Sequence, residues 1–123
     1  MSAQPSPPSP ANRPTDRWIQ LDERKAREVF PGFSGRFVHS AHMTFVHWTV
    51  EAGAVFPRHA HPHEQVVNLI DGEFELTVGG ETRKLGPRSI AVIPANVEHA
   101  GRALTACRIL DVFYPIREDY RSG

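Results

Sequence analysis

Histidines cluster in one short segment of the chain, and a further histidine follows downstream. His59 and His61 are two residues apart, and residues at this spacing on a β-strand point to the same face. Gln65 has the same parity, and His99 follows a proline-bearing turn on a later predicted strand. Three imidazoles and one side-chain oxygen suit Zn, Ni, Mn, Co or Fe. The spacing therefore predicts one divalent transition metal held by His59, His61, Gln65 and His99.

A metal site is one of two interpretations of these residues. A histidine-rich loop is often solvated surface, and a lone histidine such as His99 is often a structural residue with its own hydrogen-bond partner. Spacing alone leaves both interpretations open. His63 and Glu64, which lie inside the cluster, are predicted to be rim or supporting residues rather than ligands.

A second group of chemically useful residues lies near the C-terminus. Asp111 and Phe113 share one face of a predicted strand with Ile109, so that an acidic residue interrupts an apolar face. Burying an unpaired carboxylate is unfavourable. Asp111 is therefore expected either to pair with an arginine such as Arg117 or to act as a general acid or base. Arg117 has a further option, because its guanidinium can form a forked contact with a substrate carboxylate.

The elements that would position these residues are almost all short β-strands separated by turn signals. Asp71-Gly72 and Gly79-Gly80 are two such signals. Residues 22–29 are charged and predict one or two helical turns, a short N-terminal helix that ends at Pro31-Gly32. The predicted strands are 36–40, 43–51, 66–70, 73–78, 82–85, 89–93 and 102–113. Short strands at this spacing are typical of an all-β sandwich or barrel.

Composition limits the classes of partner. Lys plus Arg and Asp plus Glu both number 14, a balance that argues against nucleic acid or an anionic membrane surface. No apolar run approaches the ~18–20 residues that span a bilayer, and residues 1–16 do not resemble a secretory signal. The expected localisation is cytoplasmic. The five prolines of residues 1–16 predict a disordered tail, with a single domain over residues 17–123.

Two segments of the chain resemble the two sequence motifs of the cupin family. They read Gly53-(x5)-His59-x-His61-(x3)-Gln65-(x6)-Gly72 and Gly86-(x7)-Pro94-x-Asn96-x-x-His99. Cupins are double-stranded β-helices, or jelly-roll barrels, that hold a metal through three histidines and a glutamate. The resemblance implies this fold and the same ligand positions, with Gln65 in place of the glutamate. The second motif departs after Pro87, where Arg88-Ser89 replaces the usual Gly-Asp.

The glutamine changes the expected chemistry of the metal. A carboxylate ligand would cancel one charge on the ion, whereas three neutral imidazoles and the Gln65 amide cancel none, so a divalent ion keeps its full charge. This favours Lewis-acid work on an anionic ligand such as a carboxylate. It counts against a further hypothesis, an iron-dependent dioxygenase, because nothing in the ligand set stabilises a ferric state.

A narrower resemblance covers about residues 18–121. The segments His-x-His-Pro-His-Glu-Gln (59–65) and Asp-x-Phe-x-Pro-x-Arg-x-Asp-Tyr (111–120) are similar to the KdgF-type cupins of pectin and alginate breakdown. Those enzymes convert 4,5-unsaturated monouronates to linear ketonised sugar acids. The resemblance implies active-site roles for Asp111, Phe113 and Arg117, a small anionic sugar acid or carboxylate as partner, and a homodimer. A second hypothesis is a non-catalytic cupin that binds such an acid as a sensor or accessory protein.

Overall fold

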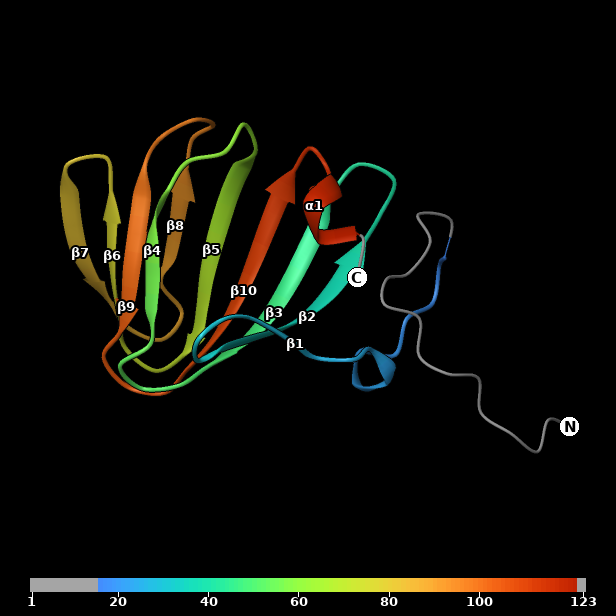
Figure 1. The fold of residues 1–123 in the computed structure, drawn as a ribbon, viewed down its shortest axis with the longest axis horizontal. Coiled ribbons are helices and arrows are strands. Elements are labelled where there is room, and N and C mark those ends of the chain that lie inside the picture. Colours follow the sequence, from blue (N-terminus) through green and yellow to red (C-terminus); the bar gives the residue numbers. More distant parts are fainter. Residues whose placement is uncertain (1–15, 122–123) are drawn as a thin grey trace, which may run out of the picture.

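Two antiparallel β-sheets face each other in a computed structural model that describes residues 16–121 (Figure 1). One sheet has the order β1 (Arg27–Phe30), β2 (Phe33–His39), β3 (Thr44–Val50), β10 (Cys107–Tyr114), β5 (Glu64–Asp71) and β8 (Ile90–Ile93). The other has the order β4 (Val55–His59), β9 (His99–Ala103), β6 (Phe74–Val78) and β7 (Glu81–Leu85). The chain passes repeatedly from one sheet to the other, which confirms the predicted all-β jelly-roll barrel.

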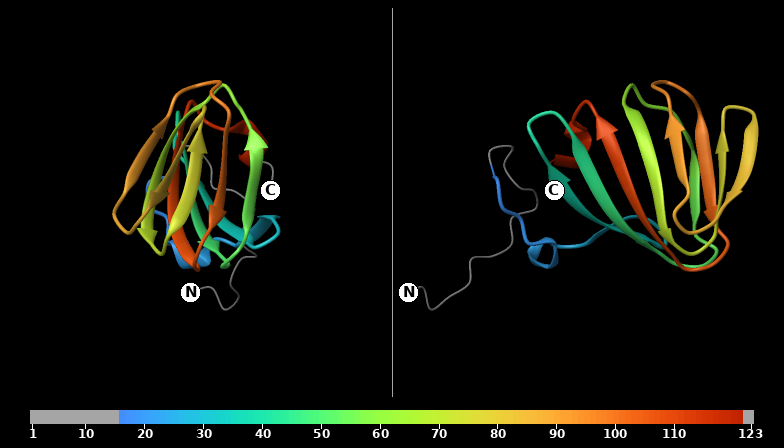
Figure 2. Two further views of the ribbon diagram at one scale, coloured as in Figure 1. Left: turned by 90° about the vertical axis from the view of Figure 1, so that its left-hand side faces the viewer. Right: turned by 180° about the vertical axis from the view of Figure 1, so that it is seen from behind.

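The strands form where apolar and polar residues alternate. In β3 and β10 every second residue is buried, so one face of each strand packs into the barrel and the other looks outward. β3 pairs with β10, and β10 in turn pairs with β5. Two further views show antiparallel strands that fan out across both sheets, with the connecting loops at the two ends of the barrel (Figure 2).

Gly72 shows why a predicted turn needs glycine. It follows β5 with φ of +95°, a left-handed conformation that residues with a Cβ rarely adopt. A Cβ at this position would also lie 2.8 Å from the Cys107 sulfur and against the Ala106 carbonyl oxygen. The turn therefore brings the start of β6 close to the start of β10, as the two sheets require.

Several elements differ from the sequence-based expectation. Residues 22–29 do not form an N-terminal α-helix: a single 3-10 turn, η1 (Leu21–Glu23), precedes β1, which pairs with β2. β4 is absent from the predicted strands; it contains Pro57, and as an edge strand it tolerates a residue without an N–H. Residues 102–113 form parts of two strands, because the N–H groups of Leu104 and Thr105 turn toward the Glu73 carbonyl. Within the part of the chain that the structure describes, one α-helix, α1 (Glu118–Arg121), follows β10.

The Arg88-Ser89 departure from the cupin motif leaves the turn intact. Arg88 adopts φ of +71°, the left-handed conformation that a glycine would take there with less strain. Its N–H donates to the Leu69 carbonyl at 2.7 Å, and the Ser89 N–H donates to the Gly86 carbonyl at 3.1 Å. These backbone hydrogen bonds hold the turn between β7 and β8.

Aromatic side chains fill the barrel interior next to the histidines, and the Phe56 ring lies with its centroid 4.5 Å from that of His59. The Phe33 ring lies edge-on to those of Trp48, Phe56 and Phe74, with centroids 5.8, 5.3 and 6.4 Å away. Phe33 is 2% exposed. This packing supports the two strands, β3 and β10, that carry residues toward the predicted site.

Replacing Phe33 with alanine is expected to lower the free energy of unfolding by about 3–5 kcal/mol, because it leaves a cavity among these rings. Urea denaturation of the metal-free protein measures the effect. Val55→Ala, at an exposed position of β4, is the control and should change stability by less than about 0.5 kcal/mol. An equally small effect for Phe33→Ala would show that the aromatic cluster is not the main core.

The outer face of the six-stranded sheet carries an uncharged strip. Val38, Phe45, Val112, Val66 and Val92 lie side by side in register across β2, β3, β10, β5 and β8, and all are at least partly exposed. The homodimer implied by the resemblance stays a prediction.

The predicted disordered tail lies, except for Asp16, outside the described residues. Within residues 16–121, no helix has the length and apolar character needed to cross a membrane.

Candidate metal centre

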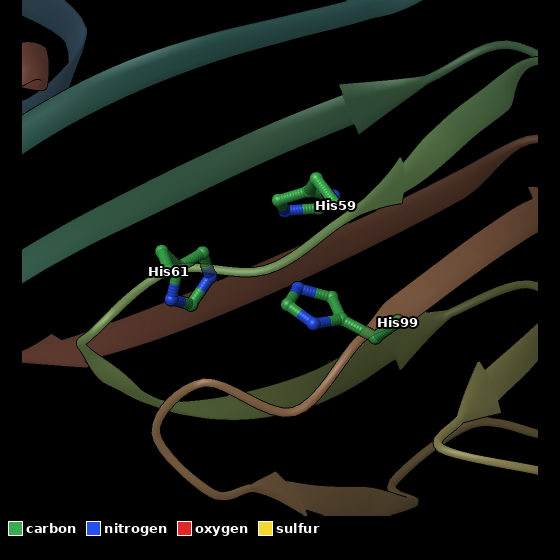
Figure 3. Close-up of side chains that lie close together, drawn as sticks. All are labelled: His59, His61 and His99. Carbon is green, nitrogen blue, oxygen red and sulfur yellow. The ribbon is translucent and has the colours of Figure 1, made fainter.

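The three predicted histidine ligands come together at one end of the barrel. His59 is the last residue of β4, His61 lies in the loop that leads to β5, and His99 is the first residue of β9. β4 pairs with β9 so that His59 lies opposite His99. One ring nitrogen from each histidine lies within 4.8 Å of those of the other two, and Figure 3 shows the three rings gathered around a common space.

Backbone carbonyl groups set the orientation of all three rings. The Nδ1 atoms of His59, His61 and His99 lie 2.9, 3.0 and 2.9 Å from the carbonyl oxygens of Pro57, His63 and Val97, respectively. A carbonyl oxygen only accepts, so each Nδ1 carries the hydrogen and donates it. Each Nε2 is then left with a free lone pair, the arrangement usual for metal-ligating histidines.

The remaining ring nitrogens and Gln65 form a group of acceptors without donors. His99 Nε2 is buried and has no hydrogen-bond partner among the described residues. His61 Nε2 lies 3.0 Å from Gln65 Oε1, and with Nδ1 protonated both of these atoms are acceptors. A cation shared by the four side chains would satisfy all of them. The donor set therefore fits a divalent metal, including the predicted fourth ligand Gln65.

Burial keeps the histidines neutral. Burial, followed by the nearby Arg117 charge, lowers the pKa of His61 to about 4. Burial also lowers the pKa of His59 and of His99. Neutral imidazoles are the form that binds metal, so at neutral pH no proton has to be displaced from these rings.

The loop that carries His61 is pinned from the second cupin motif. The Asn96 N–H donates to the His61 carbonyl oxygen at 2.8 Å. Asn96 has φ of +66°, a left-handed conformation that asparagine tolerates better than most residues. The backbone of one motif thus fixes a ligand that belongs to the other, which explains the asparagine three residues before His99.

Asp111 lies deeper in the barrel than the ligands. On β10 it is one inward-facing position from Phe113, the residue opposite Gln65. It is 5% exposed; its Oδ2 accepts the Trp48 indole N–H at 2.9 Å, and its Oδ1 has no hydrogen-bond partner among the described residues. Burial raises the pKa of Asp111 to about 6, against the opposing effects of the Gln65 amide, the Trp48 N–H and the Arg117 charge.

Arg117 is held in place by aromatic rings and by an acidic neighbour. Its guanidinium forms a forked contact with the Asp119 carboxylate, at 2.7 and 3.2 Å, and lies over the rings of Phe113 and Tyr120, 5.0 and 4.0 Å from the centroids. Its backbone N–H donates to Thr44 Oγ1 at 2.9 Å. The arginine therefore pairs with Asp119 rather than with Asp111.

Phe113 connects the arginine to the histidines. Its ring packs edge-on against His61, with centroids 5.6 Å apart, and the Arg117 guanidinium lies over the same ring. A small cavity of about 30 Å³ lies below, bordered by Gln65, His99 and Asp111 among others. All seven predicted site residues thus lie in one continuous region at one end of the barrel.

Sequence reasoning missed the residues that support this region. Trp48 was not linked to it, and the sequence motif that includes Asp119 and Tyr120 did not show that both contact the Arg117 guanidinium. The inward parity of Trp48 in β3 could have suggested that it faces the interior, but not that β3 pairs with β10 and so places it beside Asp111. His63, predicted as a rim residue, is half-buried and supplies the carbonyl group that holds His61.

Comparison with known proteins establishes the family. The family model described as the cupin domain matches residues 46–113, a stretch that contains most of the strands and every predicted site residue except Arg117. The chain belongs to the cupin family. This cupin is 29% identical over 99 residues to an uncharacterized protein of Streptomyces coelicolor, an alignment that covers 79% of this chain and 94% of the relative.

Solved structures of other cupins have the same fold. KdgF from Halomonas sp. superimposes with a TM-score of 0.79 and 30% identity, over 85% of this chain and 98% of that one. An RmlC-like cupin from Shewanella frigidimarina superimposes with a TM-score of 0.81 and 24% identity, over 86% and 96%. The second likeness concerns the fold alone. The first extends to the sequence and agrees with the KdgF-type resemblance of the site motifs.

Proposed function

We propose that this cupin uses a divalent metal to convert 4,5-unsaturated monouronates to linear ketonised sugar acids. The observation that carries the proposal is the placement of one neutral metal-ligand group, one buried arginine and one buried carboxyl group around the same end of the barrel. The metal-ligand group and Arg117 would bind the carboxylate of a uronate. Asp111 would transfer the protons that the reaction needs. The KdgF-type motifs and the likeness to KdgF support the choice of substrate class.

Arg117 and Phe113 would bind and orient the sugar acid. Asp119 accepts hydrogen bonds from Nε and Nη2 of Arg117. The hydrogens on Nη1 are left for a substrate carboxylate. Phe113 is 2% exposed and packs against both Arg117 and His61, so it would orient the sugar acid by fixing these two side chains. Arg117 would then set the substrate carboxylate toward the histidines.

The reaction itself is a hydration followed by ring opening. The double bond between carbons 4 and 5 takes a proton at carbon 4, and water adds its oxygen at carbon 5. The hemiketal so formed breaks its bond to the ring oxygen, which takes a proton, and carbon 5 becomes a ketone. Asp111, whose Oδ1 has no hydrogen-bond partner among the described residues, is the carboxyl group that would give and take these protons.

The metal would be held by His59, His61, Gln65 and His99. When bound, it would supply Lewis acidity toward an anionic carboxylate, strengthened because none of the four ligands carries a charge. The protein's own contribution is to keep the imidazoles neutral, to hold their Nδ1 hydrogens on carbonyl groups, and to place the substrate next to Asp111.

Changing Arg117 to glutamine is expected to raise the KM for the uronate by about 10–100-fold. Charge-assisted hydrogen bonds contribute about 1.5–3 kcal/mol, and each 1.4 kcal/mol corresponds to about tenfold in affinity. The KM of Arg117→Lys should lie between those of the wild type and Arg117→Gln, because lysine keeps the positive charge but cannot make the forked contact. Steady-state kinetics measures the change. Arg83→Gln on β7, where the side chain is 71% exposed, is the matched control, and an unchanged KM for Arg117→Gln would remove the arginine from the binding step.

Nuclear magnetic resonance of the reaction mixture tests the proposed function. Metal-loaded protein is incubated with unsaturated galacturonate and, separately, with the unsaturated uronate from alginate. The proposal expects the ring signals to be replaced by those of the linear keto acid, faster than in buffer. Binding without conversion would favour the non-catalytic sensor or accessory protein. If neither sugar is bound and neither is converted, the uronate proposal is contradicted.

A further inference from the structure

The Gln65 amide has to be turned one way for the metal site to work. An amide has an oxygen that accepts and an NH2 group that only donates, and only the oxygen can bind a cation. The oxygen faces His61 Nε2 at 3.0 Å. Among the described residues no donor on the histidine side holds the oxygen there, because with Nδ1 donating to the His63 carbonyl the His61 Nε2 atom is itself an acceptor.

Asp111 lies where the other end of the amide can be fixed. β5 and β10 are neighbours, with Gln65 opposite Phe113 and Val67 opposite Asp111, so that Gln65 and Asp111 occupy successive inward positions of the same sheet. Both border the small cavity next to His99. Trp48 uses only the Oδ2 atom of Asp111, and the buried Oδ1 atom has no hydrogen-bond partner among the described residues, so it is free to accept from the NH2 end of the amide.

Trp48 keeps the carboxyl group in place as an acceptor. Its indole N–H, which only donates, reaches Asp111 Oδ2 at 2.9 Å. An anchored carboxylate attracts the NH2 end of the amide and repels its oxygen. We propose that Asp111 is a positioning residue for Gln65: its carboxylate, anchored by Trp48, holds the NH2 end of the amide, so that the amide oxygen faces the three histidines and is ready for the metal.

This arrangement sets a carboxylate behind the ligands instead of among them. In the cupin pattern a glutamate touches the metal, whereas here a neutral amide stands between the ligand position and Asp111. The site therefore retains a negative charge nearby that favours a cation, while its ligands stay uncharged. The inference rests on the proposed metal centre, and it holds whether or not the substrate is a uronate.

The test is the affinity for Zn²⁺ in the absence of sugar, measured by competition with a chelator. In Asp111→Asn, the new amide must accept the Trp48 N–H through its oxygen, which directs its NH2 group toward Gln65. Gln65 then turns its own oxygen away from the histidines. The expected loss of Zn²⁺ affinity is about 10–100-fold, as found when a residue that orients a metal ligand is removed.

Repeating the measurement in the Gln65→Glu variant distinguishes a loss of Zn²⁺ affinity caused by a turned Gln65 amide from one caused by damage to the barrel. A carboxylate has two equivalent oxygens and needs no orientation, and Asp111 beside this second carboxylate would be a like charge. In that background Asp111→Asn is expected to leave Zn²⁺ affinity unchanged or to raise it. Asp71→Asn, at the exposed end of β5, is the control and should have no effect in either background.

Each outcome decides the inference. A loss in the glutamine background that disappears or reverses in the glutamate background supports it. Equal losses in both backgrounds, or no loss in either, overturn it. If Asp111→Asn does not fold by circular dichroism, Trp48→Phe is measured in the same two backgrounds, with a smaller loss expected only with glutamine. Wild-type protein that binds no Zn²⁺ would overturn both this inference and the metal centre, whereas a lack of uronate turnover would touch only the proposed reaction.

Discussion

His61→Ala is expected to abolish stable metal binding and to reduce turnover of the unsaturated uronate to the rate in buffer. His61 is the histidine that contacts the other parts of the site: Gln65 Oε1 at 3.0 Å, and the His99 and Phe113 rings at centroid distances of 4.9 and 5.6 Å. Losing a ligand should weaken binding by more than the ~10–100-fold seen when a residue supporting a ligand is lost. Metal content after dialysis, together with turnover, measures both effects.

The matched control is His42→Ala, which removes an exposed histidine from the loop between β2 and β3. It should keep one metal ion per chain and full turnover. Thermal unfolding of the metal-free proteins shows whether the barrel is intact in both variants. A His61→Ala protein that retains both the metal and its turnover would contradict the assignment of the ligands.

Asp111→Asn is expected to lower kcat by about 10²–10⁴-fold even when the metal concentration saturates the site. This is the range that general acid–base catalysis contributes, and no other carboxyl group among the described residues is both buried and next to the ligands. The asparagine keeps the shape of the side chain but cannot carry the proton. At a saturating metal concentration the site is filled in both proteins. The lower metal affinity that we expect from a misoriented Gln65 then does not affect kcat.

Asp71→Asn is again the control, since its side chain lies at the far end of β5 and its Oδ1 bond to the Gly72 N–H can be made by an asparagine. It should retain the wild-type kcat. If metal-saturated Asp111→Asn also retained the wild-type kcat, Asp111 would act only through Gln65, and the protons of the reaction would have to come from water or from another group.

The three histidines that could share a metal were named from the sequence, although strand parity was not the reason they meet, because a loop separates His59 at the end of β4 from Gln65 on β5. His59 and His61 both face the site, although His61 lies beyond the end of β4, and Gln65 follows on the next strand. The alternation of Asp111 and Phe113 in β10 was likewise visible from the sequence, and the structure confirms it. Such features depend on a few neighbouring residues, which is where periodicity is informative.

What could not be predicted depends on contacts between distant segments. Trp48 reaches Asp111 across 63 residues of chain, through a β3–β10 pairing that no local pattern specifies. Arg117 pairs with Asp119 in the segment between β10 and α1, where no strand or helix periodicity indicates which side chains meet. β4 is also absent from the predicted strands; its Pro57 is acceptable only on an edge strand.

The most direct test of metal-dependent uronate conversion is a time course of ultraviolet absorbance by the conjugated double bond of unsaturated galacturonate. Three samples are compared: metal-loaded protein, protein treated with a chelator, and the treated protein after the metal is restored. The predicted result is a loss of absorbance faster than in buffer, abolished by chelation and recovered with the metal. Absorbance that falls at the buffer rate, in protein shown to hold one metal ion per chain, would contradict the account.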